Sequence, residues 1–284
     1  METKKKKIGF ILNPYAGIGG KAGLKGSDNY KKIEKLLLEG CERTAPKRAE
    51  SCMSKIADLT ASLVEGDKGS VGEKNFSILS APGDMGEALL KKLKIPCDVV
   101  LCPKADTSSA EDTKLCAQIM KEQGVDLLVF CGGDGTARDI CEAVGTDVTV
   151  LGIPAGVKMY SACYACNPYQ AGEMLAGWLE GKEMSYEMRE VLDIEEKDLD
   201  SRNVSPQLYG FLEVLSDGKH LQKAKELDLG SGESATIIAR AAILRMEKDW
   251  VYIIGPGGTT WKIKELLCEN DEQEDTGKKN VHGT

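Results

Sequence analysis

The residues best suited to chemistry form a glycine-rich stretch at residues 132–136, Gly-Gly-Asp-Gly-Thr. The stretch follows an apolar run at residues 127–131 and leads directly into a helical pattern. Glycines allow consecutive backbone amides to point at one anion, and the N-terminus of the following helix adds a positive partial charge. The pattern therefore predicts a loop that binds a phosphate group.

Asp134 stands in the middle of this loop, where its charge would repel a phosphate. A carboxylate at this point suits two other tasks, accepting a proton from an attacking hydroxyl group or holding a magnesium ion. The alternative interpretation is a tight turn between a strand and a helix, with Asp134 as the helix cap. The five-residue pattern between a strand and a helix favours the phosphate loop.

Other glycine-rich stretches also follow apolar runs. Residues 12–21, Leu-Asn-Pro-Tyr-Ala-Gly-Ile-Gly-Gly-Lys, match neither a Rossmann fingerprint nor a P-loop, but a flexible loop with Lys21 nearby could cover phosphates. Residues 153–162 bring Lys158, Tyr160 and Ser161 to a predicted strand end. A plain loop remains the alternative for residues 12–21, and a strand-to-helix connection with a surface lysine for residues 153–162. Residues 81–87 and 255–260 repeat the pattern.

Short apolar runs alternate with helical patterns over the first 167 residues. Strands are predicted at residues 7–13, 76–80, 97–102, 126–131 and 148–153, and helices at residues 31–39, 48–65, 85–94 and 110–123, the last capped by Ser109. Nearly continuous apolar strands between helices predict an α/β fold, a parallel sheet with helices on both faces. Ligands of such sheets bind at the carboxyl ends of the strands, which is where the glycine-rich stretches lie.

The pattern changes after residue 167, and we expect a smaller α+β unit over residues 168–268. Its predicted elements are a helix at residues 169–179, strands at 189–194 and 208–215, a helix at 233–246, a strand at 250–254 that returns to the main sheet, and a helix at 262–268. Residues 269–284 are polar and acidic, and we expect a disordered tail.

Composition narrows the classes of function. The net charge of −8 argues against nucleic acid as a partner, because binding to a phosphate backbone requires a basic face. No apolar run reaches the ~20 residues of a membrane span, and no secretory signal precedes the first strand. We therefore expect a cytoplasmic protein whose ten cysteines are reduced thiols. Cys163 and Cys166 have metal-like spacing, but without a second pair we expect no zinc site.

Three stretches taken together resemble a known family. Asn13-Pro with Gly17, the loop at residues 132–136, and Ile-Pro-Ala-Gly-Val-Lys-Met at residues 153–159 are similar to the ATP-NAD kinase-like family. More narrowly, they resemble its acetoin-catabolism-X-like branch. The likeness continues through residues 190–194, 208–210 and 254–260, and so covers roughly residues 8–268.

The resemblance implies transfer of a phosphoryl group from ATP to the ribose 2′-hydroxyl group of NAD, with Mg²⁺, by a homo-oligomer. It gives Asp134 the role of catalytic base, and it places the amides of Gly132, Gly133, Gly135 and Thr136 around the pyrophosphate, with Asn13 and Gly17 beside the nucleotide. The residues facing the second substrate would be Lys158, Tyr160 and Ser161, with Gly257, Thr259 and Thr260 from the last glycine-rich stretch.

Two other hypotheses stay open. A non-catalytic nucleotide-binding sensor, or an inactive truncated paralogue, is favoured by the polar sequence after Cys268, where relatives continue with further sheet segments. A lipid or sphingoid kinase would belong to the same superfamily. Residues 154–158, Pro-Ala-Gly-Val-Lys, stand where lipid kinases carry Pro-Leu-Gly-Thr-x-Asn-Asp.

Overall fold

The computed structural model of the chain describes residues 5–18, 35, 37–65, 76–102, 108–156, 159–193, 206–222, 231–247, 250–255 and 259–268. The internal contacts divide the chain into two compact units, Met1–Lys225 and Glu226–Thr284, and each unit is described by itself. The expected boundary at residue 167 differs from this division, because the elements between residues 168 and 222 pack with the first unit.

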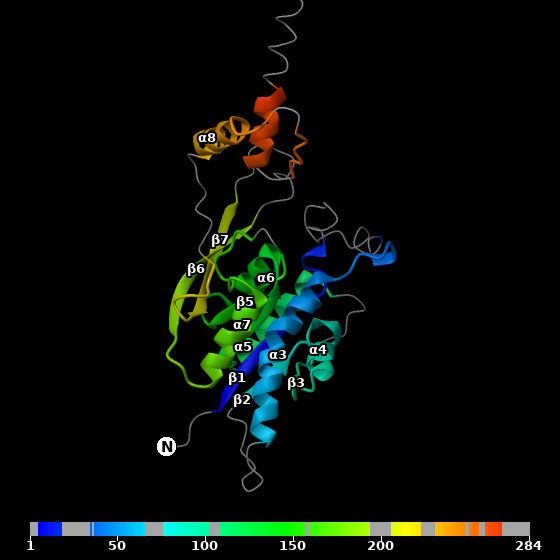
Figure 1. The fold of residues 1–284 in the computed structure, drawn as a ribbon. Helices are drawn as coiled ribbons and strands as arrows, with labels where there is room; N and C mark the ends of the chain where they lie inside the picture. Colours follow the sequence, from blue (N-terminus) through cyan, green and yellow to red (C-terminus); the bar gives the residue numbers. More distant parts are fainter. Residues whose placement is uncertain are drawn as a thin grey trace, which may run out of the picture. The chain divides into compact units, whose positions relative to one another are not determined.

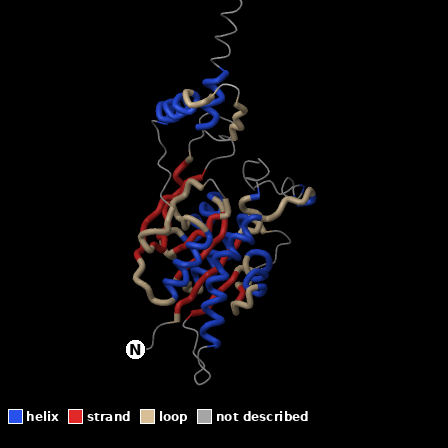
Figure 2. Tube along the Cα trace, in the orientation of Figure 1, coloured by secondary structure: helices blue, strands red, loops and turns tan. Residues whose placement is uncertain are grey.

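The first unit is built on a seven-stranded sheet, visible as the red strands of Figure 2. The strand order is β3-β2-β1-β4-β5-β7-β6, with β1 (Lys6–Leu12), β2 (Phe76–Ser80), β3 (Asp98–Val99), β4 (Leu127–Gly132), β5 (Val150–Pro154), β6 (Ser185–Asp193) and β7 (Gln207–Ser216). All neighbouring pairs are parallel except β6 and β7, which are antiparallel. The predicted parallel α/β sheet is confirmed. β6 and β7 extend this sheet.

The helices form two pairs. α3 (Thr44–Glu65) packs against α7 (Pro168–Leu179), and α5 (Ala110–Glu122) packs against α6 (Asp134–Val144). α3 leads from β1 to β2, whereas α6 leads from β4 to β5 on the other side of β1, so right-handed connections place the two pairs on opposite faces. Figure 1 shows α3 crossing in front of the strands. Every residue of β4 and β5 is buried, as expected for strands covered on both faces.

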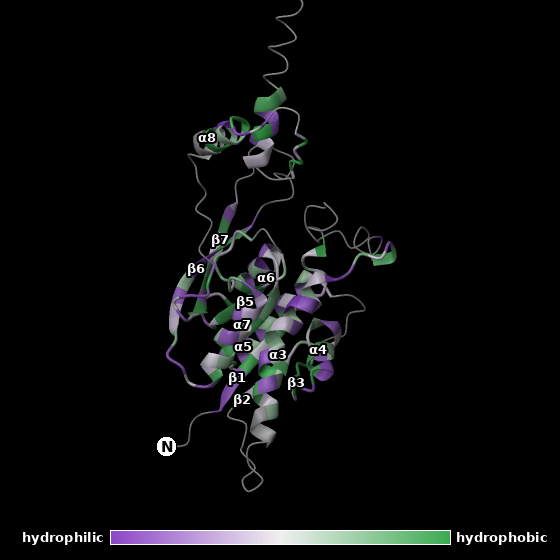
Figure 3. Cartoon of the chain, viewed as in Figure 1, coloured by the Kyte–Doolittle hydropathy of each residue, from purple (hydrophilic) through white to green (hydrophobic). Residues whose placement is uncertain are grey.

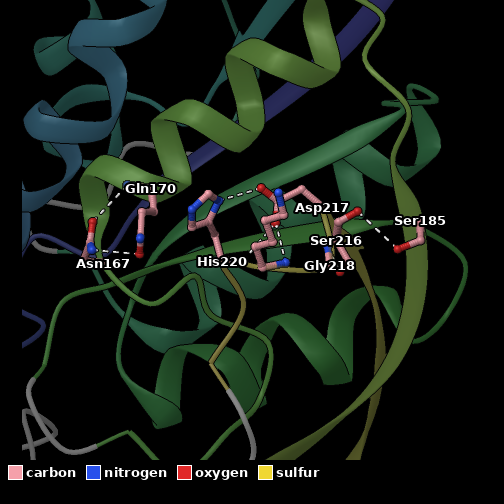
Figure 4. Close-up of polar contacts among 8 residues, drawn as sticks. Asn167, Gln170, Ser185, Ser216, Asp217, Gly218 and His220 are labelled. Atoms are coloured by element: carbon pink, nitrogen blue, oxygen red, sulfur yellow. Dashed lines mark hydrogen bonds and ion pairs between the residues drawn. The ribbon is translucent and has the colours of Figure 1, made fainter.

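Local signals explain how these helices begin. Ser109 accepts a hydrogen bond from the amide of Asp112, whose carboxylate accepts one from the amide of Ser109, so the predicted cap of α5 is confirmed as a full capping box. Asn167 caps α7 in a similar way by accepting from the amide of Gln170 (Figure 4). A short 3₁₀ turn, η1 (Gly83–Met85), and α4 (Glu87–Lys92) take the place of the single helix predicted at residues 85–94.

The second unit contains α8 (Ser231–Ile243) and a further helix at residues 259–268. Figure 3 shows that α8 mixes hydrophobic and hydrophilic residues. The strand predicted at residues 250–254 is wrong, because the described residues 250–255 have no regular secondary structure. An apolar run forms a strand only where another strand supplies hydrogen-bond partners, and Trp250, Val251 and Ile253 are instead exposed. Residues 269–284 lie outside the described part of the chain.

Candidate functional site

The strand order reverses at β1, whose neighbours are β2 on one side and β4 on the other. In open α/β sheets, ligands bind where the strand order reverses, beyond the carboxyl ends of the strands, here β1 and β4. Asn13 follows β1, and its backbone amide donates to the carbonyl of Cys131 in β4 over 2.9 Å. Its side-chain Nδ2 donates to Thr136 Oγ1 over 3.0 Å. The loop after β1 and the glycine loop after β4 therefore meet at the reversal.

The glycine loop connects β4 to α6 without a spacer. Gly133 is the N-cap of α6, and the first helical hydrogen bond runs from the amide of Ala137 to the carbonyl of Gly133 over 3.0 Å. The preceding amides of the first turn have no acceptor inside the helix. A Cβ atom at Gly133 would meet nothing within 4 Å, and at Gly135 it would meet only atoms 3.8 and 3.9 Å away. A side chain at either glycine would therefore meet no close neighbour, so these two positions of the loop are uncrowded.

Gly132 has a different reason to be glycine. A Cβ atom at Gly132 would lie 2.3 Å from the Cβ of Thr136, so a side chain there would collide with the first turn of α6. Its carbonyl accepts from the amide of Ala155 over 2.9 Å. Gly132 thus allows β4, α6 and the segment after β5 to pack closely.

Asp134 is held by the backbone of a segment 26 residues later in the chain. Its Oδ2 accepts from the amide of Tyr160 and its Oδ1 from the amide of Ser161, each over 2.9 Å. Burial is the main cause that raises the pKa of Asp134, and the nearby Asp193 adds to the rise, while the two backbone hydrogen bonds oppose it. The raised pKa brings this carboxyl group closer to the working pH of a general base.

Two residues that the sequence analysis did not single out complete this region. Asp193 ends β6, and its Oδ2 lies 2.8 Å from Arg138 Nη1 and 3.8 Å from the position of a Cβ at Gly135. The guanidinium group of Arg138 lies over the ring of Tyr209, 5.6 Å from its centroid. Asp193 belongs to a stretch quoted for the family resemblance, residues 190–194, whereas Arg138 does not, and only the pairing of β6 with β7 brings Asp193 to α6.

The loop after β1 packs on the segment after β5. Gly17 has a φ of +80°, and a Cβ atom there would lie 2.3 Å from the carbonyl oxygen of Ala155. Arg48 from α3 donates to the carbonyl of Pro154 over 3.1 Å. Gly17 therefore packs against the backbone of Ala155, whose own amide donates to Gly132 of the glycine loop.

The predicted second-substrate residues are only partly brought together. Tyr160 is half-buried beside Asp134, and burial, followed by the charge of Asp134, raises the pKa of its phenol. The Ser161 hydroxyl is buried, donates to the carbonyl of Leu192 over 2.8 Å and accepts from its amide over 3.0 Å, so it is engaged with β6. The other four are placed as follows: Lys158 and Gly257, like Lys21, lie outside the described residues, and Thr259 and Thr260 lie in the second unit.

The glycine loop and the half-buried Asp134 lie together at the strand reversal of a doubly wound α/β sheet, where the ligands of such sheets bind, and the family match makes this a kinase-type phosphotransferase domain. The chain belongs to the ATP-NAD kinase family. The family described as "ATP-NAD kinase N-terminal domain" matches residues 8–183, more than half of the chain, and confirms the resemblance. No individual curated protein matches the chain. The matched range ends just before β6 and so does not include Asp193.

Two further findings apply to the described residues alone. None of the helices there is both long enough and apolar enough to cross a membrane. No group of three or more His, Cys, Asp or Glu side chains there could hold a metal ion.

Proposed function

We propose that the chain is an NAD kinase, which transfers the γ-phosphoryl group of ATP to the ribose 2′-hydroxyl group of NAD and so forms NADP. The observation that carries the proposal is the position of Asp134, a half-buried carboxylate at the first residue of α6, between two glycines whose Cβ positions are uncrowded. Membership of the ATP-NAD kinase family supports the choice of ATP and NAD.

The proposed reaction divides its work between the loop and one carboxylate. The amides of Gly132, Gly133, Gly135 and Thr136 bind pyrophosphate oxygens, and Asn13 and Gly17 lie beside the nucleotide. Asp134 accepts the proton of the 2′-hydroxyl group while the new O–P bond forms and the bond from the γ-phosphorus to the β-phosphate oxygen breaks, releasing ADP. Its raised pKa favours this role because the proton transfer is then better matched to neutral pH.

The donor set fits the Mg²⁺ ion that accompanies ATP in such reactions. Mg²⁺ usually takes one or two protein carboxylates together with substrate phosphates, and Asp193, whose Oδ2 lies 3.8 Å from the position of a Cβ at Gly135, would supply one such oxygen while Asp134 acts as the base. When bound, the ion neutralises charge that develops on the phosphate oxygens. Lys158, Tyr160 and Ser161, together with Gly257, Thr259 and Thr260, stay our candidates for contacts to NAD, with Ser161 acting through its backbone amide on Asp134.

The test is NADP formation by the purified chain with ATP, Mg²⁺ and NAD, measured beside Asp134→Asn. NADP from the wild type, with a loss of at least about a hundredfold in the variant, would support the reaction, the acceptor and the base together. Equal rates in both would contradict the role of Asp134. NADP from neither would contradict the proposal.

The second candidate is a non-catalytic nucleotide-binding sensor. It is favoured by one observation, that both carboxylate oxygens of Asp134 already accept backbone hydrogen bonds. Calorimetric binding of ATP or NAD by the wild type, without turnover in the assay above, would select this candidate.

A further inference from the structure

The side chain of Tyr164 is completely buried beneath the glycine loop. Its hydroxyl donates to the carbonyl oxygen of Gly133 over 2.5 Å, and its ring makes an edge contact with Phe130 of β4 at a centroid distance of 5.4 Å. Neither contact follows from a motif, because Tyr164 lies 31 residues after Gly133. The phenol thus links two distant parts of the chain at the point where α6 begins.

The sheet is shaped to admit this ring. Gly152 in β5 bridges to Tyr164 in parallel, with hydrogen bonds from the Gly152 amide to the Cys163 carbonyl and from the Ala165 amide to the Gly152 carbonyl. A Cβ atom at Gly152 would lie 2.6 Å from the ring carbon Cδ1 of Tyr164. The position of the phenol is therefore fixed by backbone pairing as well as by its own hydrogen bond.

The hydrogen bond to Gly133 has a directional consequence. A trans peptide unit is planar, so the carbonyl of Gly133 and the amide of Asp134 point in opposite directions. The carbonyl is held by the Tyr164 hydroxyl and by the amide of Ala137. The amide of Asp134 must then point away from the buried phenol and out of the N-terminus of α6.

The same segment fixes the loop at a second point, because the amides of Tyr160 and Ser161 hold the carboxylate of Asp134. We propose that Tyr164 is a positioning residue of the site, whose hydroxyl orients the Gly133–Asp134 peptide so that its amide faces the phosphate groups of a bound nucleotide. This inference rests on the proposed function, since it assumes that a nucleotide binds at the loop.

Tyr164→Phe removes the hydroxyl and keeps the ring, and Thr113→Val is the matched control. Thr113 is also buried, and its hydroxyl donates to a backbone carbonyl, that of Ser109, over 3.1 Å at the start of α5. Both variants therefore lose one hydroxyl-to-carbonyl hydrogen bond, but only one of these bonds is at the glycine loop. The full-length chain is titrated calorimetrically with ATP and, separately, with inorganic pyrophosphate, and the melting temperature of each variant is recorded.

We expect Tyr164→Phe to weaken binding of both probes about tenfold, the equivalent of one lost hydrogen bond. We expect Thr113→Val to bind both probes as the wild type does, although its melting temperature falls by a similar amount. A purely structural role of the Tyr164 hydroxyl would lower the melting temperature without changing the two dissociation constants, and that result would overturn the inference.

The two proposals fail in different ways. If the wild type binds ATP and Tyr164→Phe binds it equally well, the inference is overturned and the proposed function stands. If the wild type binds neither probe, the proposed function is contradicted and the inference falls with it. Should Tyr164→Phe not fold, replacement of Tyr164 by 4-fluorophenylalanine fills the space of the hydroxyl but removes the donor to the Gly133 carbonyl, and wild-type affinity for ATP in that variant would equally overturn the inference.

Discussion

The side-chain amide of Asn13 donates to the hydroxyl oxygen of Thr136 over 3.0 Å, and this contact joins the loop after β1 to the first turn of α6. The Asn13 side chain also accepts from the amide of Tyr15 over 3.1 Å, which fixes the start of its own loop. One residue at the strand reversal therefore orders both loops of the proposed nucleotide site. Its type matters because the side-chain amide carries a donor and an acceptor on separate atoms, one for each loop.

Asn13→Ala tests this link. The variant loses both side-chain hydrogen bonds, so we expect the KM for ATP to rise about tenfold and the free energy of unfolding to fall by about 1–2 kcal/mol. Steady-state kinetics and urea denaturation measure the two effects. Gln170→Ala, which removes an exposed partner of Asn167 at the start of α7, is the control and should leave the KM unchanged. An unchanged KM for ATP in Asn13→Ala would separate Asn13 from the site.

Asp134→Asn should lower kcat by about 10²–10⁴-fold, because the amide cannot accept the proton of the attacking hydroxyl group. The structure adds a second effect. An asparagine at this position accepts through one oxygen only, so its NH₂ group would face the backbone amide of Tyr160 or Ser161. We therefore expect a moderate loss of stability as well, measured by urea denaturation.

A control separates these two effects of Asp134→Asn. Ser161→Ala removes the hydroxyl that bonds Leu192 and keeps the carboxylate of Asp134, but it also removes a side-chain hydrogen bond that lowers the pKa of Asp134. We expect it to lower stability by about 1–2 kcal/mol and kcat by less than tenfold. If Ser161→Ala lowered kcat as far as Asp134→Asn, loss of the base would not explain the effect of the latter.

Asp193→Asn should change the pH dependence of the reaction. Burial raises the pKa of Asp134 most, and the charge of Asp193 raises it further. Because the base must be ionised, kcat/KM falls as the pH drops through this pKa. Removing the charge of Asp193 lowers the pKa, so we expect the acid limb of the kcat/KM profile to move to lower pH. Asp98→Asn, an exposed carboxylate of β3, should leave the limb in place. A limb that stayed in place or moved up in Asp193→Asn would count against this coupling.

The buried framework was predictable because its signals are local. β1, β2 and β4 lie within one or two residues of the predicted ranges, since an almost continuous apolar run is what a strand covered on both faces requires. The apolar run at residues 250–254 looks similar in sequence, yet it forms no strand. Whether a neighbouring strand is present to pair with an apolar run depends on the whole fold. The sequence of the run alone does not carry this information.

The candidate site divides in the same way. The loop at residues 132–136 was found because its glycines are consecutive and their geometry is local. Tyr164 and Asp193 were missed because they reach the loop through pairing across the sheet, Tyr164 through Gly152 and Asp193 through β7. Tyr164 stands next to no glycine or charged residue, and Asp193 is one of many acidic residues in its stretch, so only the strand register reveals their positions.

Asp217 provides a test of stability away from the glycine loop (Figure 4). Burial acts to raise its pKa, but hydrogen bonds from the amides of Lys219 and His220, and the imidazole of His220 at 2.6 Å, outweigh burial and lower it. A lowered pKa stabilises the fold above the pKa of the unfolded chain, about 3.9, and the benefit is lost as the pH falls through the folded value. The free energy of unfolding of Asp217→Asn should therefore be about 1 kcal/mol lower than that of the wild type near pH 7. This difference between the two proteins should disappear below about pH 4. Urea denaturation at several pH values measures this, and a gap independent of pH would contradict it.

Gly17→Ala and Gly40→Ala form a matched pair, because both glycines have a left-handed φ, +80° and +86° respectively, and differ only in their surroundings. An alanine pays the same backbone strain of about 1–2 kcal/mol at either position. At Gly40 the new Cβ atom meets nothing within 4 Å, whereas at Gly17 it would lie 2.3 Å from the carbonyl oxygen of Ala155. We therefore expect Gly17→Ala to be the more destabilising by at least about 1 kcal/mol, and to raise the KM for ATP, because the clash pushes the loop after β1 away from the segment that holds Asp134. Urea denaturation and ATP kinetics on the two variants measure both effects. Equal losses of stability in the two variants would contradict the prediction. They would mean that the loop moves to avoid the clash without a cost in free energy, and that only the left-handed φ requires a glycine at position 17.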